Sequence, residues 1–133
     1  MSGLEYDWER FAETWATSGC VRSGQVDPTM RPSQEHLLCD EFVELHPDAA
    51  DFLLTKLCDP DPYLAAYAFK CLIRLRDLEM KDIPQTILYR ADPIRTQWGC
   101  VIRSNTLGSF IRGYWGFEDP EPEPPTRPKR YLP

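Results

Sequence analysis

The chain has 133 residues, a formal net charge of −6 and a hydrophobic content of 42%. A length of about 100 to 150 residues is typical of one domain with a full core, and the apolar content excludes a disordered chain. No apolar run approaches the roughly 18 residues of a membrane span, and residues 1–15 are acidic where a secretory signal would be basic and then apolar. We therefore expect a soluble cytoplasmic protein without membrane contact.

The charge is distributed unevenly along the chain. Residues 1–61 carry 13 acidic and 4 basic side chains, a net of −9, whereas residues 62–113 carry 4 acidic and 8 basic side chains, a net of +4. An acidic surface repels nucleic acid and attracts basic partners, so nucleic acid is disfavoured, although the basic residues of the second segment could form a ridge. A solvated surface without a partner explains the same imbalance.

Residues 1–18 are predicted to form an N-terminal helix. Its apolar side chains recur at spacings of four, three and four, which places Leu4, Trp8, Phe11 and Trp15 on one helical face. Burial in the core is the favoured interpretation of this face, and an anchor for a partner helix is the alternative. The next segment, up to residue 32, mixes glycine, proline and polar residues without a period, which predicts a loop over residues 19–32.

Three further helices are predicted between residues 33 and 75. Ser33 caps the first of them, which ends before Pro47 because a proline disfavours the helical conformation in the preceding residue. Pro47 then suits the first turn of the second helix. The turn after residue 58 reads Asp-Pro-Asp-Pro, and Asp61 is predicted to cap the third helix.

The apolar pattern then repeats with a shift of thirty residues. A short helix is predicted near residues 83–90, and a longer helix is predicted to start at Asp92-Pro93 and to continue through Ile102. The shift pairs six apolar positions of the first copy with apolar positions of the second. Helix pairs with uncovered apolar faces stack on one another, so the predicted fold is an all-α stack of antiparallel helix pairs with about six helices.

The end of the chain carries weaker signals. Past Gly108, glycines interrupt the apolar residues, which predicts a closing turn in place of a full helix. Residues 118–133 are proline-dense and charged, so an extended tail is predicted there. Residues 1–117 then form a single helical domain, within which residues 33–112 supply the helix pairs.

The five cysteines are odd in number and contain no C-x-x-C pair. Four of them fall inside apolar helical patterns, which predicts free, buried thiols in a reducing compartment. They are Cys39, Cys58, Cys71 and Cys100, and Cys20 precedes them in the loop.

Residues 53–75 resemble a HEAT repeat. They combine a helix that ends in leucine, an Asp-Pro turn and a second helix with apolar and small residues four apart. In the second copy, Arg95 stands where the family favours arginine. The resemblance covers residues 47–112 and implies an α–α superhelix whose second helices line a concave surface that holds a partner.

No catalytic residue, cofactor site or metal site is predicted. The histidines, His36 and His46, are ten positions apart and form no metal-binding pair, and the glycines match no phosphate-binding loop. Asp59 and Asp61 each precede a proline and suit capping better than proton transfer, and Cys39 lies among apolar neighbours. We therefore predict that the chain is not an enzyme.

These features favour a protein-binding module, most specifically a small acidic immunity-type or antitoxin-type protein that neutralises a partner toxin or enzyme with a basic surface. A HEAT-like adaptor or scaffold subunit is the alternative, a nucleic-acid-binding or enzymatic HEAT-like protein is less favoured, and a homodimer is compatible with uncovered end helices. Partner contacts are predicted in an acidic group, Asp40, Glu41, Glu44, Asp48 and Asp51, and on the second helices, at Tyr63, Lys70, Arg74 and Arg95.

Overall fold

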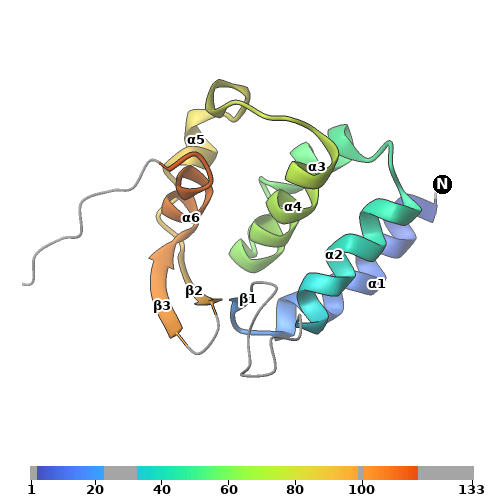
Figure 1. Cartoon of the computed structure of the whole chain (residues 1–133), viewed down its shortest axis with the longest axis horizontal. Helices are drawn as coiled ribbons and strands as arrows, with labels where there is room; N and C mark the ends of the chain where they lie inside the picture. Colours follow the sequence, from blue (N-terminus) through green and yellow to red (C-terminus); the bar gives the residue numbers. More distant parts are fainter. Residues whose placement is uncertain (1–2, 23–32, 99–100, 117–133) are drawn as a thin grey trace, which may run out of the picture.

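The computed structural model describes residues 3–22, 33–98 and 101–116. Within these residues the chain is mainly helical and also carries a small three-stranded sheet (Figure 1). In chain order the elements are α1 (Gly3–Thr17), β1 (Val21–Arg22), α2 (Gln34–Leu45), α3 (Ala50–Lys56), α4 (Pro62–Leu75), the 3₁₀ helix η1 (Met80–Asp82), α5 (Gln85–Leu88), β2 (Pro93–Trp98), β3 (Val101–Thr106) and α6 (Leu107–Gly113).

The aromatic face of α1 lies in the core. Trp8, Phe11 and Trp15 are buried, which confirms the helical face predicted from their spacing. Their rings pack around Phe42 of α2, and Trp15 stacks on Tyr67 of α4 with ring centroids 5.5 Å apart. The N-terminal helix is therefore part of the core, although a connecting segment separates it from α2 in the sequence.

Side-chain caps start α2 and α4 where the sequence predicts them. The side chains of Ser33 and Asp61 accept hydrogen bonds from backbone N–H groups in the first helical turn, at 3.1 and 2.9 Å. The start of α3 differs from the prediction, because the helix begins at Ala50. Pro47 lies instead in the turn that joins α2 to α3.

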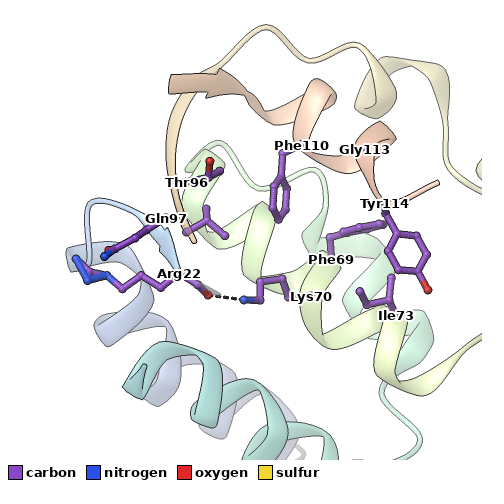
Figure 2. A pocket seen from close by; sticks show the side chains of 10 residues that line it. Arg22, Phe69, Lys70, Ile73, Thr96, Gln97, Phe110, Gly113 and Tyr114 are labelled. Atoms are coloured by element: carbon purple, nitrogen blue, oxygen red, sulfur yellow. Dashed lines mark hydrogen bonds between the residues drawn. The ribbon is translucent and has the colours of Figure 1, made fainter. Parts of the chain in front are cut away.

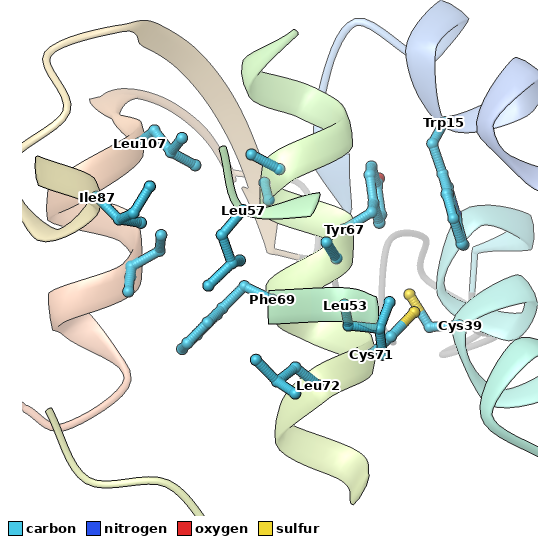
Figure 3. Close-up of a cluster of buried hydrophobic side chains, with 14 of the residues drawn as sticks. Trp15, Cys39, Leu53, Leu57, Tyr67, Phe69, Cys71, Leu72, Ile87 and Leu107 are labelled. Atoms are coloured by element: carbon cyan, nitrogen blue, oxygen red, sulfur yellow. The ribbon is translucent and has the colours of Figure 1, made fainter. Parts of the chain in front are cut away.

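α4 lies at the centre of the molecule. Figure 1 shows α1 and α2 on one side of it and α5, α6, β2 and β3 on the other. Half of its 14 residues are buried, and small alanines among them let neighbouring elements approach closely from more than one direction. Its aromatic side chains serve both sides (Figure 3): Tyr67 meets α1, and Phe69 meets Phe110 of α6 with ring centroids 6.4 Å apart.

β2 and β3 occupy Pro93–Trp98 and Val101–Thr106, so the fold is mainly helical but not all-α, and the predicted long helix from Asp92-Pro93 is wrong. β2 and β3 pair antiparallel, and β1 adds to β2 in parallel, which gives the order β1-β2-β3. The segment is rich in isoleucine, threonine and valine, whose branched side chains favour strands over helices. Buried Ile94 and exposed Arg95 show the alternation of a strand.

The shift of thirty residues consequently does not relate two helix pairs. It aligns Leu64 and Leu72 of α4 with Ile94 of β2 and Ile102 of β3. Leu72 is fully buried, whereas Ile102 is 50% exposed. Both copies are apolar at these positions. Side chains repeat every 3.6 residues in a helix and every two residues in a strand, so different positions of the two copies face the core.

The predicted closing turn is a short helix, α6. Thr106 caps it by accepting a hydrogen bond from the Ser109 N–H at 3.1 Å. Gly108 lies in its first turn, against the backbone of residues 88–90. The predicted tail, residues 118–133, lies outside the described residues.

The buried-thiol prediction is confirmed for two of the four cysteines it covered. Cys39 and Cys71 are free and buried, as is Cys20 in the segment after α1. The thiols of Cys39 and Cys71 face each other between α2 and α4 (Figure 3), and burial raises the pKa of Cys71 and keeps it a neutral thiol. Cys58 is exposed just past the end of α3, which contradicts the prediction, and Cys100 lies outside the described residues.

A hydrogen-bonded pair of side chains, His46 and Asp7, links the end of α2 to α1 and makes the stability depend on acid. Nε2 of His46 lies 2.8 Å from Oδ2 of Asp7. Hydrogen bonds from His46 and then Arg10 hold the pKa of Asp7 below its ordinary value of 3.8. Ionised Asp7 therefore stabilises the fold above that ordinary value, and the contribution is lost as the pH falls through the lowered pKa.

We expect Asp7→Asn to remove this part of the acid dependence. The variant should be less stable than the wild type near neutral pH, and the difference should shrink as the pH falls below the ordinary Asp pKa of 3.8. Urea denaturation followed by circular dichroism at each pH measures it. A stability difference that stays constant as the pH falls would show that the Asp7 carboxylate does not contribute through its charge.

Candidate functional site

Three of the five predicted acidic residues remain available on the surface. Glu41 and Glu44 lie on α2 and Asp48 in the turn that follows it, and all three are exposed. None of them forms an ion pair within residues 3–22, 33–98 and 101–116. Their charges therefore face solvent and are free to attract a cation.

The other two acidic residues already have partners. Oδ1 of Asp40 lies 2.6 Å from Nε of Arg74, and Oδ1 of Asp51 lies 3.2 Å from Nη2 of Arg76. The first of these pairs ties α2 to α4, and the second ties α3 to the residue that ends α4. Both carboxylates are consequently less available to a partner than the first three.

Two exposed leucines share the outer face of α2 with the acids. Leu37 is 49% exposed and Leu45 is 51% exposed, and their helical spacing puts them beside Glu41 and Glu44. Between residues 33 and 55 the chain has six acidic residues and no lysine or arginine. We call this surface the acidic α2 face; it consists of Leu37, Glu41, Glu44, Leu45 and Asp48.

The second predicted group does not lie on second helices only. Tyr63, Lys70 and Arg74 belong to α4, but Arg95 lies on β2, so its predicted helical position is wrong. The Tyr63 hydroxyl accepts a hydrogen bond from the Arg95 backbone N–H at 2.9 Å, which brings those two residues together. Lys70 and Arg74 instead meet around His36 of α2.

The contacts of His36 place it between two cations. Nζ of Lys70 lies 3.4 Å from Nδ1 of His36, and Nη2 of Arg74 lies 3.2 Å from its Nε2. Burial lowers the pKa of His36, and the charges of Lys70 and Arg74 lower it further. The neutral imidazole can therefore accept a hydrogen bond and adds no third positive charge to the cluster.

A cavity of about 370 Å³ opens beside Lys70, between α4, α6, β1 and β2 (Figure 2). Its apolar wall includes Phe69 and Ile73 of α4 and Phe110 and Tyr114 at α6. No pattern in the sequence indicates this cavity, because its walls come from elements far apart in the chain. Val21, Arg22, Lys70, Thr96, Gln97 and Gly113 complete the lining.

The weak candidates for catalysis have structural contacts. Oδ1 of Asp59 accepts a hydrogen bond from the Asp61 N–H at 2.8 Å, and Asp61 caps α4. His46 pairs with Asp7, and Cys39 is buried beside Cys71. In the part of the chain that the structure describes, no three His, Cys, Asp or Glu side chains are grouped to hold a metal ion. No helix among those residues is both long enough and apolar enough to cross a membrane.

No protein family matches the chain, and neither a curated protein nor a solved structure does. The functional argument therefore depends on two surfaces of this molecule. One is the acidic α2 face, and the other is the cavity beside Lys70.

Proposed function

We propose that this chain is a protein-binding module that presents the acidic α2 face to a basic surface of its partner. The observation that carries the proposal is the combination, on one helix face, of two half-exposed leucines with carboxylates that have no ion pair among the described residues. Apolar side chains at the centre of an interface supply affinity, and charges around them supply specificity and a fast encounter.

The more specific form of the proposal is an immunity-type or antitoxin-type neutraliser. A basic active site that binds nucleic acid or another anion would be covered by a surface of matching acidity, and the neutraliser itself needs no catalytic group. The charge supports this form: the segment that contains the face has six acidic residues and no basic one, apart from histidine. Association should therefore weaken as the salt concentration rises.

An adaptor role in the manner of HEAT repeats is the second candidate. It is favoured by the helix pair α3 and α4, which packs together and supplies the centre of the fold. The segment from residue 93 gives it no support, because strands replace the second helix there. An adaptor would bind two proteins at once, whereas a neutraliser needs one.

The test is co-expression with the product of the adjacent reading frame. We expect a one-to-one complex in size-exclusion chromatography and relief of any toxicity that the neighbour causes. The double variant Glu41→Lys/Glu44→Lys should weaken the complex by about tenfold or more, because it places two positive charges against a basic partner. Isothermal titration calorimetry at two salt concentrations measures the affinity.

The matched control is Glu9→Lys/Glu13→Lys, which makes the same change in charge on the exposed side of α1. High salt screens the long-range effect of net charge. Under that condition the control should bind the partner within about twofold of the wild type. Equal weakening by both double variants at high salt would remove the acidic α2 face as the interface. Failure to form any complex with the neighbour's product would count against the neutraliser form.

A further inference from the structure

Lys70 carries a positive charge that no carboxylate balances among the described residues. Its Nζ donates a hydrogen bond to the Arg22 carbonyl and lies 3.4 Å from Nδ1 of His36, and both of these acceptors are neutral. The charge of Asp40 on α2 acts on Lys70 through space, but the Asp40 carboxylate forms its ion pair with Arg74. A partly buried ammonium without an anion is costly, because the low dielectric around it no longer screens the charge as water does.

The cavity beside Lys70 combines an apolar wall with a cationic edge. Figure 2 shows Phe69, Phe110 and Tyr114 on one side, Arg22 and Gln97 on the other, and Lys70 between them. Among the residues that the structure describes, no acidic side chain lines the space. Glu35, 3.7 Å from Arg22, offsets the guanidinium but makes no ion pair with Lys70.

We propose that this cavity binds a small amphiphilic carboxylate, with its apolar body against the aromatic wall and its carboxylate paired with the Lys70 ammonium. One uncompensated ammonium balances the single charge of a carboxylate, whereas a phosphate monoester carries nearly two charges at neutral pH and would leave one unbalanced. Phe69, Phe110 and Tyr114 supply the apolar surface that a ligand body needs.

The size of the cavity limits the ligand. At about 30 Å³ for each water-sized group, 370 Å³ holds about a dozen non-hydrogen atoms, which is the size of a decanoate ion. Decanoate, 1-decanol and decyltrimethylammonium share one apolar chain and differ in the charge of the head group. They therefore separate the effect of the ammonium from simple burial of a hydrocarbon.

The test is isothermal titration calorimetry of the full chain with these three probes below their aggregation concentrations. Decanoate should bind one-to-one and about tenfold tighter than decanol, because a hydrogen bond to a charged group contributes more than one to a neutral group. Decyltrimethylammonium should bind weakest of the three. Equal binding of decanoate and decanol, or no binding of decanoate, would overturn the proposal.

Two variants identify the site. Lys70→Met keeps the side-chain length and removes the charge, so the preference for decanoate over decanol should disappear while decanol still binds. Lys81→Met, at an exposed position of η1 that does not line the cavity, removes a positive charge elsewhere on the surface and should leave all three affinities within about twofold. A preference that survives Lys70→Met would assign the head group to another cation and overturn the proposal.

The variant Gly113→Leu tests the cavity itself. Gly113 lines the cavity, and a Cβ there would meet no atom within 4 Å, so we expect a leucine at this position to fit without a clash and to fill part of the space. Binding of all three probes should fall by about tenfold or more, because they share the apolar chain that the leucine would displace. The melting temperature should stay at or above that of the wild type. Unchanged binding of decanoate by this folded variant would place the ligand elsewhere and overturn the proposal.

Discussion

Replacement of Trp15 by alanine is expected to lower the free energy of unfolding by about 3 to 5 kcal/mol. Trp15 is fully buried and joins three helices. Its ring stacks on Tyr67 of α4 at an interplanar angle of 8°, and its Nε1 donates a hydrogen bond to the Glu35 carbonyl of α2 at 3.1 Å. Alanine would leave a cavity at the point where α1, α2 and α4 meet, and the Glu35 carbonyl would lose this donor.

Urea denaturation at neutral pH measures the effect, and two further variants make it interpretable. Trp15→Phe keeps a ring but loses the indole N–H, so we expect a smaller loss, about 1 to 2 kcal/mol, which is measurable even if the alanine variant does not fold. Tyr6→Ala removes an aromatic side chain that is 67% exposed on the same helix and should change stability by less than about 0.5 kcal/mol. A wild-type stability for Trp15→Ala would mean that α1 does not dock on the core in solution.

The elements that the sequence predicted well are those fixed by local chemistry. The face of α1 follows from the spacing of its aromatic residues, because 3.6 residues per turn brings them together whatever the rest of the chain does. Caps at Ser33 and Asp61 depend on side chains within three residues of the N–H groups that they satisfy. Neither feature needs knowledge of distant residues.

The predicted helix at β2 is wrong because the dipeptide Asp-Pro precedes a helix at one place in this chain and a strand at another. Asp61-Pro62 and Asp92-Pro93 look alike, but the residues after Pro62 include three alanines, which favour a helix, and the residues after Pro93 include isoleucine, threonine and valine. Apolar matches across the shift of thirty residues concealed this difference. Sheet formation also needs β1, whose pairing with β2 joins residues more than seventy positions apart, and no local pattern reports it.

The two candidate surfaces also differ in how far the sequence indicates them. The acids of the acidic α2 face could be found in the sequence because charged residues between apolar helical positions face solvent. The cavity could not, since Arg22 and Lys70 are 48 positions apart and meet only in the folded chain. Residues 62–113 also contain eight basic residues, and the sequence alone does not show that the Lys70 ammonium is partly buried while others are solvated.

Replacement of Gly108 by alanine is expected to destabilise the fold by at least about 2 kcal/mol, although helix propensity alone predicts a gain of up to about 1 kcal/mol. A Cβ at this position would lie 2.4 Å from the Leu88 carbonyl oxygen and 2.9 Å from the Arg90 nitrogen. Both atoms belong to the backbone and cannot rotate away. The Gly108 N–H also donates to the Arg90 carbonyl at 3.0 Å, so α6 cannot shift without losing this bond.

Gly113→Ala in the same helix is the matched control, because its Cβ would meet no atom within 4 Å. We expect Gly113→Ala to be neutral or stabilising by up to about 1 kcal/mol, so the two substitutions should have opposite signs in urea denaturation. Gains of similar size in both variants would show that α6 is not held against residues 88–90. If the signs differ as expected, Gly108→Ala should also weaken decanoate binding, because α6 carries Phe110 in the wall of the cavity.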